Sequence, residues 1–214
     1  ILCVVGDADF KDVVNFAEKS FSEKNGKLPE FKITEKNNSK IEKRKGIDQT
    51  NLIFAYHIPK YGDKRNHAAE VLSTLMAGGM SSRLFSEIRE KRNLAYSISG
   101  RSNINKDYSY NFIQVGTTKE NMEKVRGLIL EEFKKVAENL GEKELKQTKE
   151  QIIGNYRIEM EDSQTQMVSL MMHEINGKAE DFYEFEKIIS KVRIEDVKKL
   201  AEIKNYSFFV LVPE

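Results

Sequence analysis

The chain has 214 residues and a mass of 24.7 kDa, so it can bury a sizeable core and form one or two domains. Its 35 lysines and arginines balance 34 acidic residues, and a net charge of +1 gives no field that would attract nucleic acid or an anionic membrane. We therefore expect neither as a partner. The single cysteine, Cys3, lies in an apolar run and cannot form an internal disulfide, which favours a buried, reduced thiol in a cytoplasmic protein.

The first fifty residues divide into a short structured segment and a linker. Residues 1–5 form an apolar run that predicts a fully buried strand, and residues 11–21 have the spacing of an amphipathic helix with Asp9 as its N-cap. The chain starts in this strand without a methionine, which suggests a piece of a longer polypeptide. Residues 22–50 are polar and lysine-rich, and we predict a solvated linker there. The helix residues expected to face inward are Val13, Val14, Phe16, Ala17 and Phe21.

The second unit, residues 51–214, alternates between the two periodicities of regular structure. Period-two alternation predicts strands, and apolar residues three and four apart predict helices. Strands at both ends of the unit, with most helices between them, indicate an α+β fold: an antiparallel or mixed β-sheet with helices packed on one face. Strands are expected over residues 51–58, 95–104, 108–116 and 206–212, and helices over residues 66–76, 117–140, 142–176 with an interruption near Gly154 or Asp162, 181–191 and 194–203.

Local signals mark the boundaries of these elements. Gly78 and Gly79 permit positive φ angles at the end of a helix, and Ser81 or Ser82 can cap the short helix that follows. The residues 117–120, Thr-Thr-Lys-Glu, predict a capping box for the next long helix.

None of the histidines completes a zinc motif. His67 and Glu70 match the first positions of H-x-x-E-H, but Val71 stands where the second histidine is required. His173 begins H-E-x-x-H, and Gly177 replaces its second histidine. We therefore expect no metal ligand in this chain. The three histidines, His57, His67 and His173, are expected to be structural or surface residues.

Residues 78–96 combine a glycine hinge, a short amphipathic helix with arginines and a tyrosine that opens a strand. Arg89 follows an apolar position by four residues and projects from the flank of the apolar face; Tyr96 comes seven residues later. A guanidinium and a phenol near each other can donate hydrogen bonds to a carbonyl oxygen or an oxyanion. From spacing alone, the alternative stays open that Arg89 pairs with Glu87 or Glu90 and that Tyr96 only packs.

This segment resembles the signature of the C-terminal half of a known family, the pitrilysin and mitochondrial-processing-peptidase zinc proteases, also called inverzincins. The match comprises Gly-Gly-Met-Ser-Ser-Arg-Leu-Phe at residues 78–85, Ile-Arg-Glu-Lys at 88–91 and Leu-Ala-Tyr-Ser at 94–97. Residues 1–21, with the turn Val-Val-Gly-Asp at 4–7, resemble the closing strand and helix of the N-terminal half. The resemblance covers essentially the whole chain.

In such proteases two similar α+β halves enclose a chamber, and the N-terminal half holds zinc with H-x-x-E-H and a distal glutamate. The resemblance implies that Arg89 and Tyr96 reach across the chamber, hold the substrate carbonyl and stabilise the oxyanion made by zinc-bound water. Arg83 is a further candidate, either for positioning the helix or for binding substrate in the cleft. The sequence departs from the family pattern at Asn93, where glycine is usual, and in lacking the zinc motif.

Three functions are compatible with these observations. In the first, residues 51–214 are the C-terminal, substrate-binding half of a zinc endopeptidase that cleaves peptides or unfolded proteins. Zinc is then held by the N-terminal half or by a homologous subunit in a dimer, and this chain alone binds no zinc and is inactive. The alternative is a non-catalytic partner subunit of a peptidase or processing complex, whose parent lacks a zinc site. The third is a generic binding domain in which Arg89 forms a salt bridge.

Overall fold

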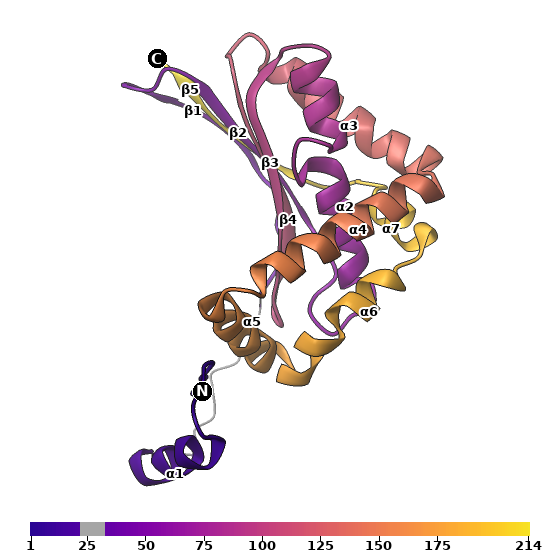
Figure 1. Cartoon of the computed structure of the whole chain (residues 1–214). Coiled ribbons are helices and arrows are strands. Elements are labelled where there is room, and N and C mark those ends of the chain that lie inside the picture. Colours follow the sequence, from indigo (N-terminus) through magenta and orange to yellow (C-terminus); the bar gives the residue numbers. More distant parts are fainter. Residues whose placement is uncertain (22–32) are drawn as a thin grey trace.

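The computed structural model describes residues 1–21 and 33–214 (Figure 1). The elements, in chain order, are α1 (Phe10–Ser20), β1 (Ser39–Arg44), β2 (Thr50–His57), α2 (Asn66–Ala77), the π-helical turn η1 (Phe85–Glu90), β3 (Ala95–Ile104), β4 (Ser109–Thr117), α3 (Met122–Asn139), α4 (Glu142–Glu159), α5 (Ser163–Asn176), the 3₁₀ helix η2 (Ala179–Glu184), α6 (Phe185–Ser190), α7 (Ile194–Leu200) and β5 (Ser207–Pro213).

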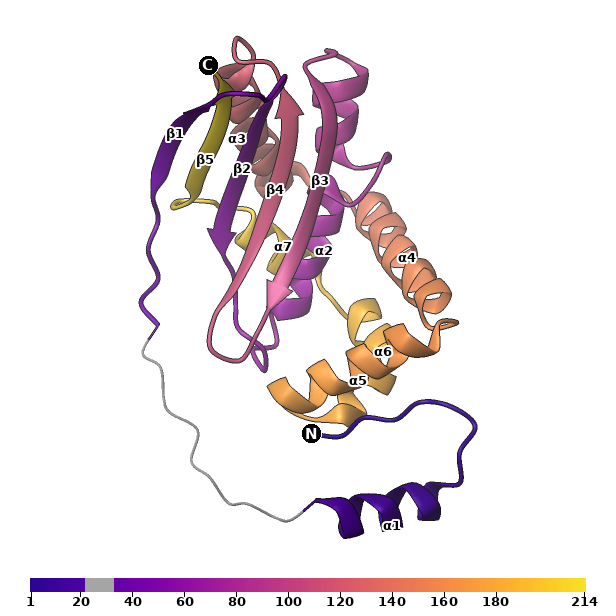
Figure 2. The same cartoon turned by 90° about the vertical axis from the view of Figure 1, so that its left-hand side faces the viewer.

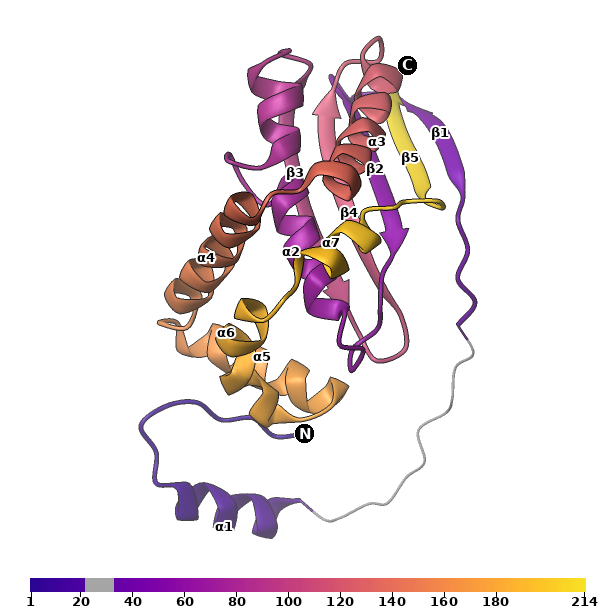
Figure 3. The same ribbon diagram turned by 90° about the vertical axis from the view of Figure 1, so that its right-hand side faces the viewer.

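Five strands form one mixed sheet in the order β1-β5-β2-β4-β3. β1 and β5 run parallel, and the other neighbouring strands are antiparallel. Helices α2, α3, α4 and α7 lie on one side of the sheet, whereas no helix of the described residues covers its other face (Figures 1, 2 and 3). The predicted α+β fold, with a mixed sheet and helices on one face, is confirmed.

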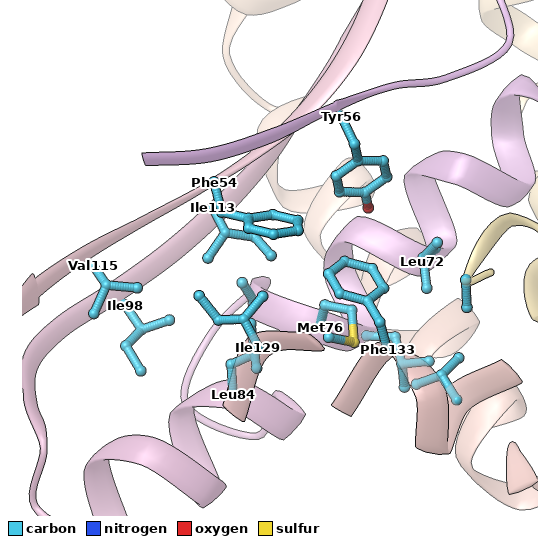
Figure 4. Packing of buried hydrophobic residues seen from close by; sticks show 14 of the residues in the cluster. Phe54, Tyr56, Leu72, Met76, Leu84, Ile98, Ile113, Val115, Ile129 and Phe133 are labelled. Carbon is cyan, nitrogen blue, oxygen red and sulfur yellow. The ribbon is translucent and has the colours of Figure 1, made fainter. Parts of the chain in front are cut away.

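The core lies between the sheet and its helices. Along β2 the side chains alternate, so that Phe54 and Tyr56 are buried toward the helices while Ile53 on the opposite face is 39% exposed. Phe54 and Tyr56 both pack against Phe133 of α3, with ring centroids 5.8 and 5.2 Å apart (Figure 4). Burying each such side chain stabilises the fold by about 1.5–3 kcal/mol, which fixes the sheet and helices as a rigid support.

The predicted buried strand at residues 1–5 is wrong for this structure. These residues form no strand, and Ile1 is 78% exposed. A strand needs backbone partners on a neighbouring strand, and no strand of the described sheet pairs with this segment. The Cys3 thiol is half-buried rather than buried, and its Sγ donates a hydrogen bond to the Met167 carbonyl at 3.3 Å.

Helix α1 forms as expected, but its apolar face is uncovered. The Asp9 carboxylate accepts hydrogen bonds from the backbone N–H groups of Lys11 and Asp12, so the predicted N-cap is confirmed. No residue of α1 is buried, and the expectation that Phe16 and Phe21 face a core is wrong within the described residues.

The predicted linker at residues 22–50 is only partly tested and partly wrong. Residues 22–32 lie outside the described residues. Residues 39–44 form strand β1, which pairs with β5. All six of its side chains are exposed, so the strand leaves no apolar alternation in the sequence and is held by backbone hydrogen bonds.

Two of the three predicted cap sites fail. Neither η1 nor α3 has a side-chain cap: the hydroxyl oxygen of Ser82 is buried without a hydrogen bond, and the Thr117 hydroxyl donates instead to the Leu94 carbonyl. In contrast, the interruption predicted near Asp162 is confirmed, because this carboxylate accepts a hydrogen bond from Thr165 N–H and begins α5.

In the described part of the chain, no helix is both long and apolar enough to cross a membrane.

Candidate functional site

The π-helical turn η1 places Arg89 on the surface. The Lys91 N–H donates to the Ser86 carbonyl at 2.9 Å, a five-residue spacing that widens the turn. Phe85 and Ile88 point into the core, which leaves Arg89 exposed on the flank of the apolar face. Its Cζ lies 4.8 Å from the Phe85 ring centroid, a cation–π contact worth about 0.5–1 kcal/mol at an exposed site.

Arg83 connects the segment before η1 to two helices. Its Nε and Nη2 atoms donate to the two carboxylate oxygens of Glu144 on α4, each at 2.6 Å, and Nη1 lies 3.5 Å from the Glu132 carboxylate on α3. Glu144, reinforced by Glu132, raises the pKa of the Arg83 guanidinium against the opposing effect of burial. These contacts support a positioning role for Arg83 rather than substrate binding, because its donors already have partners.

The acids nearest to Arg89 in sequence are engaged elsewhere. Glu87 pairs with Lys91 and Arg92, and these partners lower the pKa of its carboxyl group to about 2. Glu90 accepts a hydrogen bond from the Ser86 hydroxyl at 3.1 Å. Arg89 forms no ion pair with any residue in 1–21 or 33–214, so the salt bridge to Glu87 or Glu90 that the sequence left open is absent there.

Asn93 turns the chain from η1 into β3. It is the only residue other than glycine in the described ranges with a positive φ, at 51°. Its N–H donates to the Arg89 carbonyl at 3.0 Å, and the Leu94 N–H donates to the Ile88 carbonyl at 2.9 Å. Asparagine tolerates the left-handed region better than most residues. Asn93 therefore adopts the left-handed conformation that this turn requires.

Tyr96 is the extra residue of a β-bulge at the start of β3. Ala95 pairs with Thr117 and Ser97 pairs with Gly116, so Tyr96 has no partner on β4. Bulges re-aim a side chain and occur next to active sites, and Tyr96 is 59% exposed. The Thr117 hydroxyl fixes this corner through its 2.5 Å hydrogen bond to the Leu94 carbonyl.

Arg89 and Tyr96 thus lie at one end of the sheet's edge strand. The turn η1 packs against β3, and Figure 2 shows this helical segment beside the start of the strand. Neither side chain forms a side-chain hydrogen bond within the described residues, and both present donors to solvent. The family resemblance singled out the two residues, whereas neither the π-helical turn nor the bulge has a simple sequence signal. Asparagine is suited to a positive φ, so Asn93 is the residue that could have indicated the sharp corner.

No group of three or more potential ligands for a metal ion lies together in the described ranges. His67 Nδ1 lies 3.5 Å from the Glu70 carboxylate, but Val71, at the position of the missing ligand, is fully buried in the core. The ring of His173 bonds to the Ser169 carbonyl of its own helix at 2.9 Å. The surroundings of these side chains are those of structural residues.

Solved structures share this fold. The chain aligns with a protease from Helicobacter pylori at a TM-score of 0.82 and 20% identity, over 98% of this chain and 54% of that one. A structure of the peptidase M16 inactive domain from Pseudomonas fluorescens gives a TM-score of 0.80 at 20% identity, over 98% and 52%. The chain therefore shares the fold of these structures and covers about half of each of their chains.

The sequence comparison gives the family. The family described as Peptidase M16 inactive domain matches residues 1–152, and the chain belongs to this family. An uncharacterized zinc protease of Rickettsia felis is 30% identical over 212 residues, covering 94% of this chain and 49% of that protein. The uncharacterized zinc protease YmxG of Bacillus subtilis is 27% identical, over 98% and 52%. The chain thus spans about half the length of these curated relatives, and the resemblance to this protease family is confirmed.

Proposed function

We propose that this chain is the substrate-binding half of a zinc-dependent endopeptidase and that Arg89 and Tyr96 are its catalytic residues. Membership of the M16 inactive-domain family and the zinc-protease names of its relatives support the class of reaction. The observation that carries the residue assignment is that Arg89 is exposed on η1 without an ion pair among the described residues, next to the bulge that exposes Tyr96.

The chemistry requires donors where negative charge develops. When a peptide carbonyl is attacked, its oxygen becomes an oxyanion, and hydrogen bonds aimed at this position lower the barrier. The Arg89 guanidinium supplies charge and several N–H donors, and the Tyr96 phenol supplies one O–H donor. A zinc ion held outside this chain would supply the activated water. The roles of Arg89 and Tyr96 are therefore to orient the carbonyl and to stabilise the charge that it acquires.

The proposal needs a second half-domain. Because Val71 and Gly177 occupy the missing ligand positions, the metal must come from an N-terminal half of the same polypeptide or from a homologous subunit in a dimer. Arg83 serves as the positioning residue that ties η1 to α3 and α4. The substrates are peptides or unfolded proteins.

Turnover of the whole protease tests the proposal. Arg89→Ala is expected to lower kcat by about 100- to 1000-fold, as for the loss of one oxyanion donor, with zinc content unchanged. The control is Arg193→Ala, which removes an arginine that is exposed and paired with Asp196 on α7. Wild-type turnover in Arg89→Ala contradicts the assignment. A full-length protein that carries no zinc, with or without a partner subunit, supports instead a non-catalytic partner subunit.

A further inference from the structure

We propose that a cavity at the N-terminal end of α2 binds the phosphate group of a small phosphate monoester. The cavity has a volume of about 410 Å³ and lies between the turn that follows β2 and residues of α5, η2, α6 and α7. Helix α2 packs against α6 and α7, and Figure 3 shows its first turn at the lower end of the sheet.

The cavity lies at the other end of the sheet from Arg89 and Tyr96. Tyr96 is beside the part of β4 that pairs with the first residues of β2, whereas the cavity begins after the last residue of β2. The eight residues of β2 span roughly 25 Å at about 3.3 Å per residue. The inference is therefore independent of the proposed function.

The first observation is that the N-terminus of α2 has free donors. Arg65, at the N-cap position, gives no side-chain cap, and the first turn holds no acidic residue. Ala69 N–H donates to the Arg65 carbonyl at 3.2 Å, but the N–H groups of His67 and Ala68 have no backbone acceptor among the described residues. Both residues line the cavity. Free N–H groups at the positive end of a helix are suited to bind phosphate oxygens.

The second observation is an unpartnered amide in the same wall. Asn66 is the first residue of α2, lines the cavity and is only 3% exposed. Its Oδ1 atom is buried without a hydrogen bond among the described residues. A half-turn of the amide exchanges Oδ1 and Nδ2, so this side chain can offer a donor to an anion. A buried polar group without a partner in the chain indicates a ligand or a water that supplies one.

The third observation is positive charge without a counter-charge. Lys64 precedes α2 and Lys191 follows α6, and both line the cavity. Neither forms an ion pair with a residue in 1–21 or 33–214, although other exposed lysines of the chain do. Two lysines beside a helix N-terminus match the double negative charge of a phosphate group better than the single charge of a carboxylate.

The three carboxylates in the cavity wall already have partners within the chain. The pairs are Asp63 with Arg65, Asp196 with Arg193, and Asp181 with the Tyr61 hydroxyl. In the first two pairs both carboxylate oxygens accept hydrogen bonds from the guanidinium, at 2.7–3.1 Å. Two of the three negative charges are thus balanced by arginines, so the two lysines and the helix N-terminus leave the cavity positive.

The remaining walls fit a small organic group attached to the phosphate. A phosphate group fills only part of a volume of about 410 Å³. The rings of Tyr61 and His173 meet edge to face, with centroids 6.3 Å apart, and the side chains of Ile188 and Val192 line the same space. Aromatic and aliphatic walls around a few polar groups are typical of small-molecule sites. The ligand is therefore a monoester rather than free phosphate.

Titration of the full chain with inorganic phosphate tests the inference. The backbone amide signals are followed by NMR at constant ionic strength. We expect saturable shifts at His67 and Ala68, because their N–H groups gain an acceptor. Acetate, with one charge, should bind about 10-fold more weakly or worse. Absence of shifts at these two amides, or equal affinity for acetate, overturns the inference.

Phenyl phosphate, as a model monoester, tests the organic part of the site. Its ring can lie against the aromatic and aliphatic walls, so it should bind about 10-fold more tightly than inorganic phosphate and shift the signals of Ile188 and Val192 as well. Equal affinity of the two probes, with no shift at these residues, overturns the assignment of a monoester.

Lysine variants locate the phosphate group. Lys64→Gln and Lys191→Gln should each weaken phosphate binding by about 10-fold, because each removes a charged donor from the cavity wall. The control is Lys187→Gln, since Lys187 is on α6, pairs with Glu184 and does not line the cavity. Wild-type affinity in both cavity variants, or equal weakening in the control, overturns the inference.

A substitution at Asn66 separates binding from folding. Asn66→Asp puts a negative charge at the first position of α2, where it is favourable for the helix and repels phosphate. Phosphate affinity should fall by at least about 10-fold while the circular dichroism spectrum is unchanged. Wild-type affinity in the folded variant contradicts the site. The two lysine variants, which change exposed side chains, decide the question if Asn66→Asp does not fold.

Discussion

Asn93 shows how a single backbone conformation determines the position of the candidate site. With φ at 51°, it reverses the chain between Arg89 and the Tyr96 bulge. A β-branched residue in this region costs about 1–3 kcal/mol, whereas glycine has no such cost. Strain at this position would shift Arg89 and Tyr96, because the N–H groups of Asn93 and Leu94 tie the corner to the carbonyls of Arg89 and Ile88.

The first prediction follows from this geometry. Asn93→Val should lower the free energy of unfolding by about 1–3 kcal/mol, and Asn93→Gly should change it by less than about 1 kcal/mol. Urea denaturation of the two variants measures the difference. Equal stability of Asn93→Val and the wild-type chain would show that the corner is not held in the left-handed region.

A second prediction concerns Arg83, whose loss leaves a buried acid without a partner. Glu132 is 3% exposed and keeps only Lys135 when Arg83 is removed. Breaking a buried ion pair by removing one member costs about 3–5 kcal/mol, and the remaining lysine reduces this to an expected 2–4 kcal/mol for Arg83→Ala. Chemical denaturation checks the value. The control is Arg193→Ala, which removes an arginine from an exposed ion pair and should leave the free energy of unfolding within about 1 kcal/mol of wild type.

At the scale of the residue, the sequence identified the two donors but not how they are exposed. The choice of Arg89 and Tyr96 follows from the resemblance to the protease family, because their spacing alone left a salt bridge and simple packing open. The π-helical hydrogen bonds of η1 and the missing partner of Tyr96 on β4 depend on the packing of Phe85 and on the strand register, which are tertiary properties.

At the scale of the element, η1 is held together by charges. Lys91 and Arg92 stabilise the ionised form of Glu87, so its carboxyl pKa in the folded chain is about 2, against an ordinary 4.5. A lowered pKa contributes stability that is present above the unfolded pKa and is lost as the pH falls through the folded one.

Lowering the pH should therefore reduce the free energy of unfolding of the wild-type chain more than that of Glu87→Gln. Relative to wild type, we expect Glu87→Gln to be less stable by about 1–2 kcal/mol at pH 7 after allowance for solvent screening, and this difference to shrink between pH 4.5 and pH 2. Urea unfolding of both proteins across this range measures it. A difference that stays constant with pH contradicts the assigned pairing of Glu87.

Elements with an apolar face were predictable, and those held by backbone bonding alone were not. The alternation in β2 and β5 and the spacing in α2 and α3 gave these elements within a few residues. Strand β1 has no buried side chain, so its sequence predicts a linker and carries no signal of a strand. The apolar run at residues 1–5 predicted a strand whose pairing partners the described residues do not provide.

At the scale of the whole molecule, our proposal gives this chain the oxyanion donors and places the zinc outside it. Val71 lies in the core at the position of a zinc ligand, and Gly177 has no side chain to bind one. The purified chain should therefore retain less than about one zinc ion per ten chains after dialysis and should not hydrolyse peptides. Elemental analysis and a fluorogenic peptide assay check this; a stoichiometric, dialysis-resistant zinc ion would place a site within the chain.

The most direct test of the central claim is the kcat of the full-length protease carrying Tyr96→Phe, which removes one hydroxyl from the bulge. The control is Tyr108→Phe, in the turn that joins β3 to β4 at the far end of the hairpin, where the side chain is also exposed. If Tyr96 stabilises the oxyanion, kcat falls by about 100- to 1000-fold with KM and zinc content little changed, while Tyr108→Phe keeps the wild-type rate. A wild-type kcat in Tyr96→Phe would contradict the catalytic role of this site.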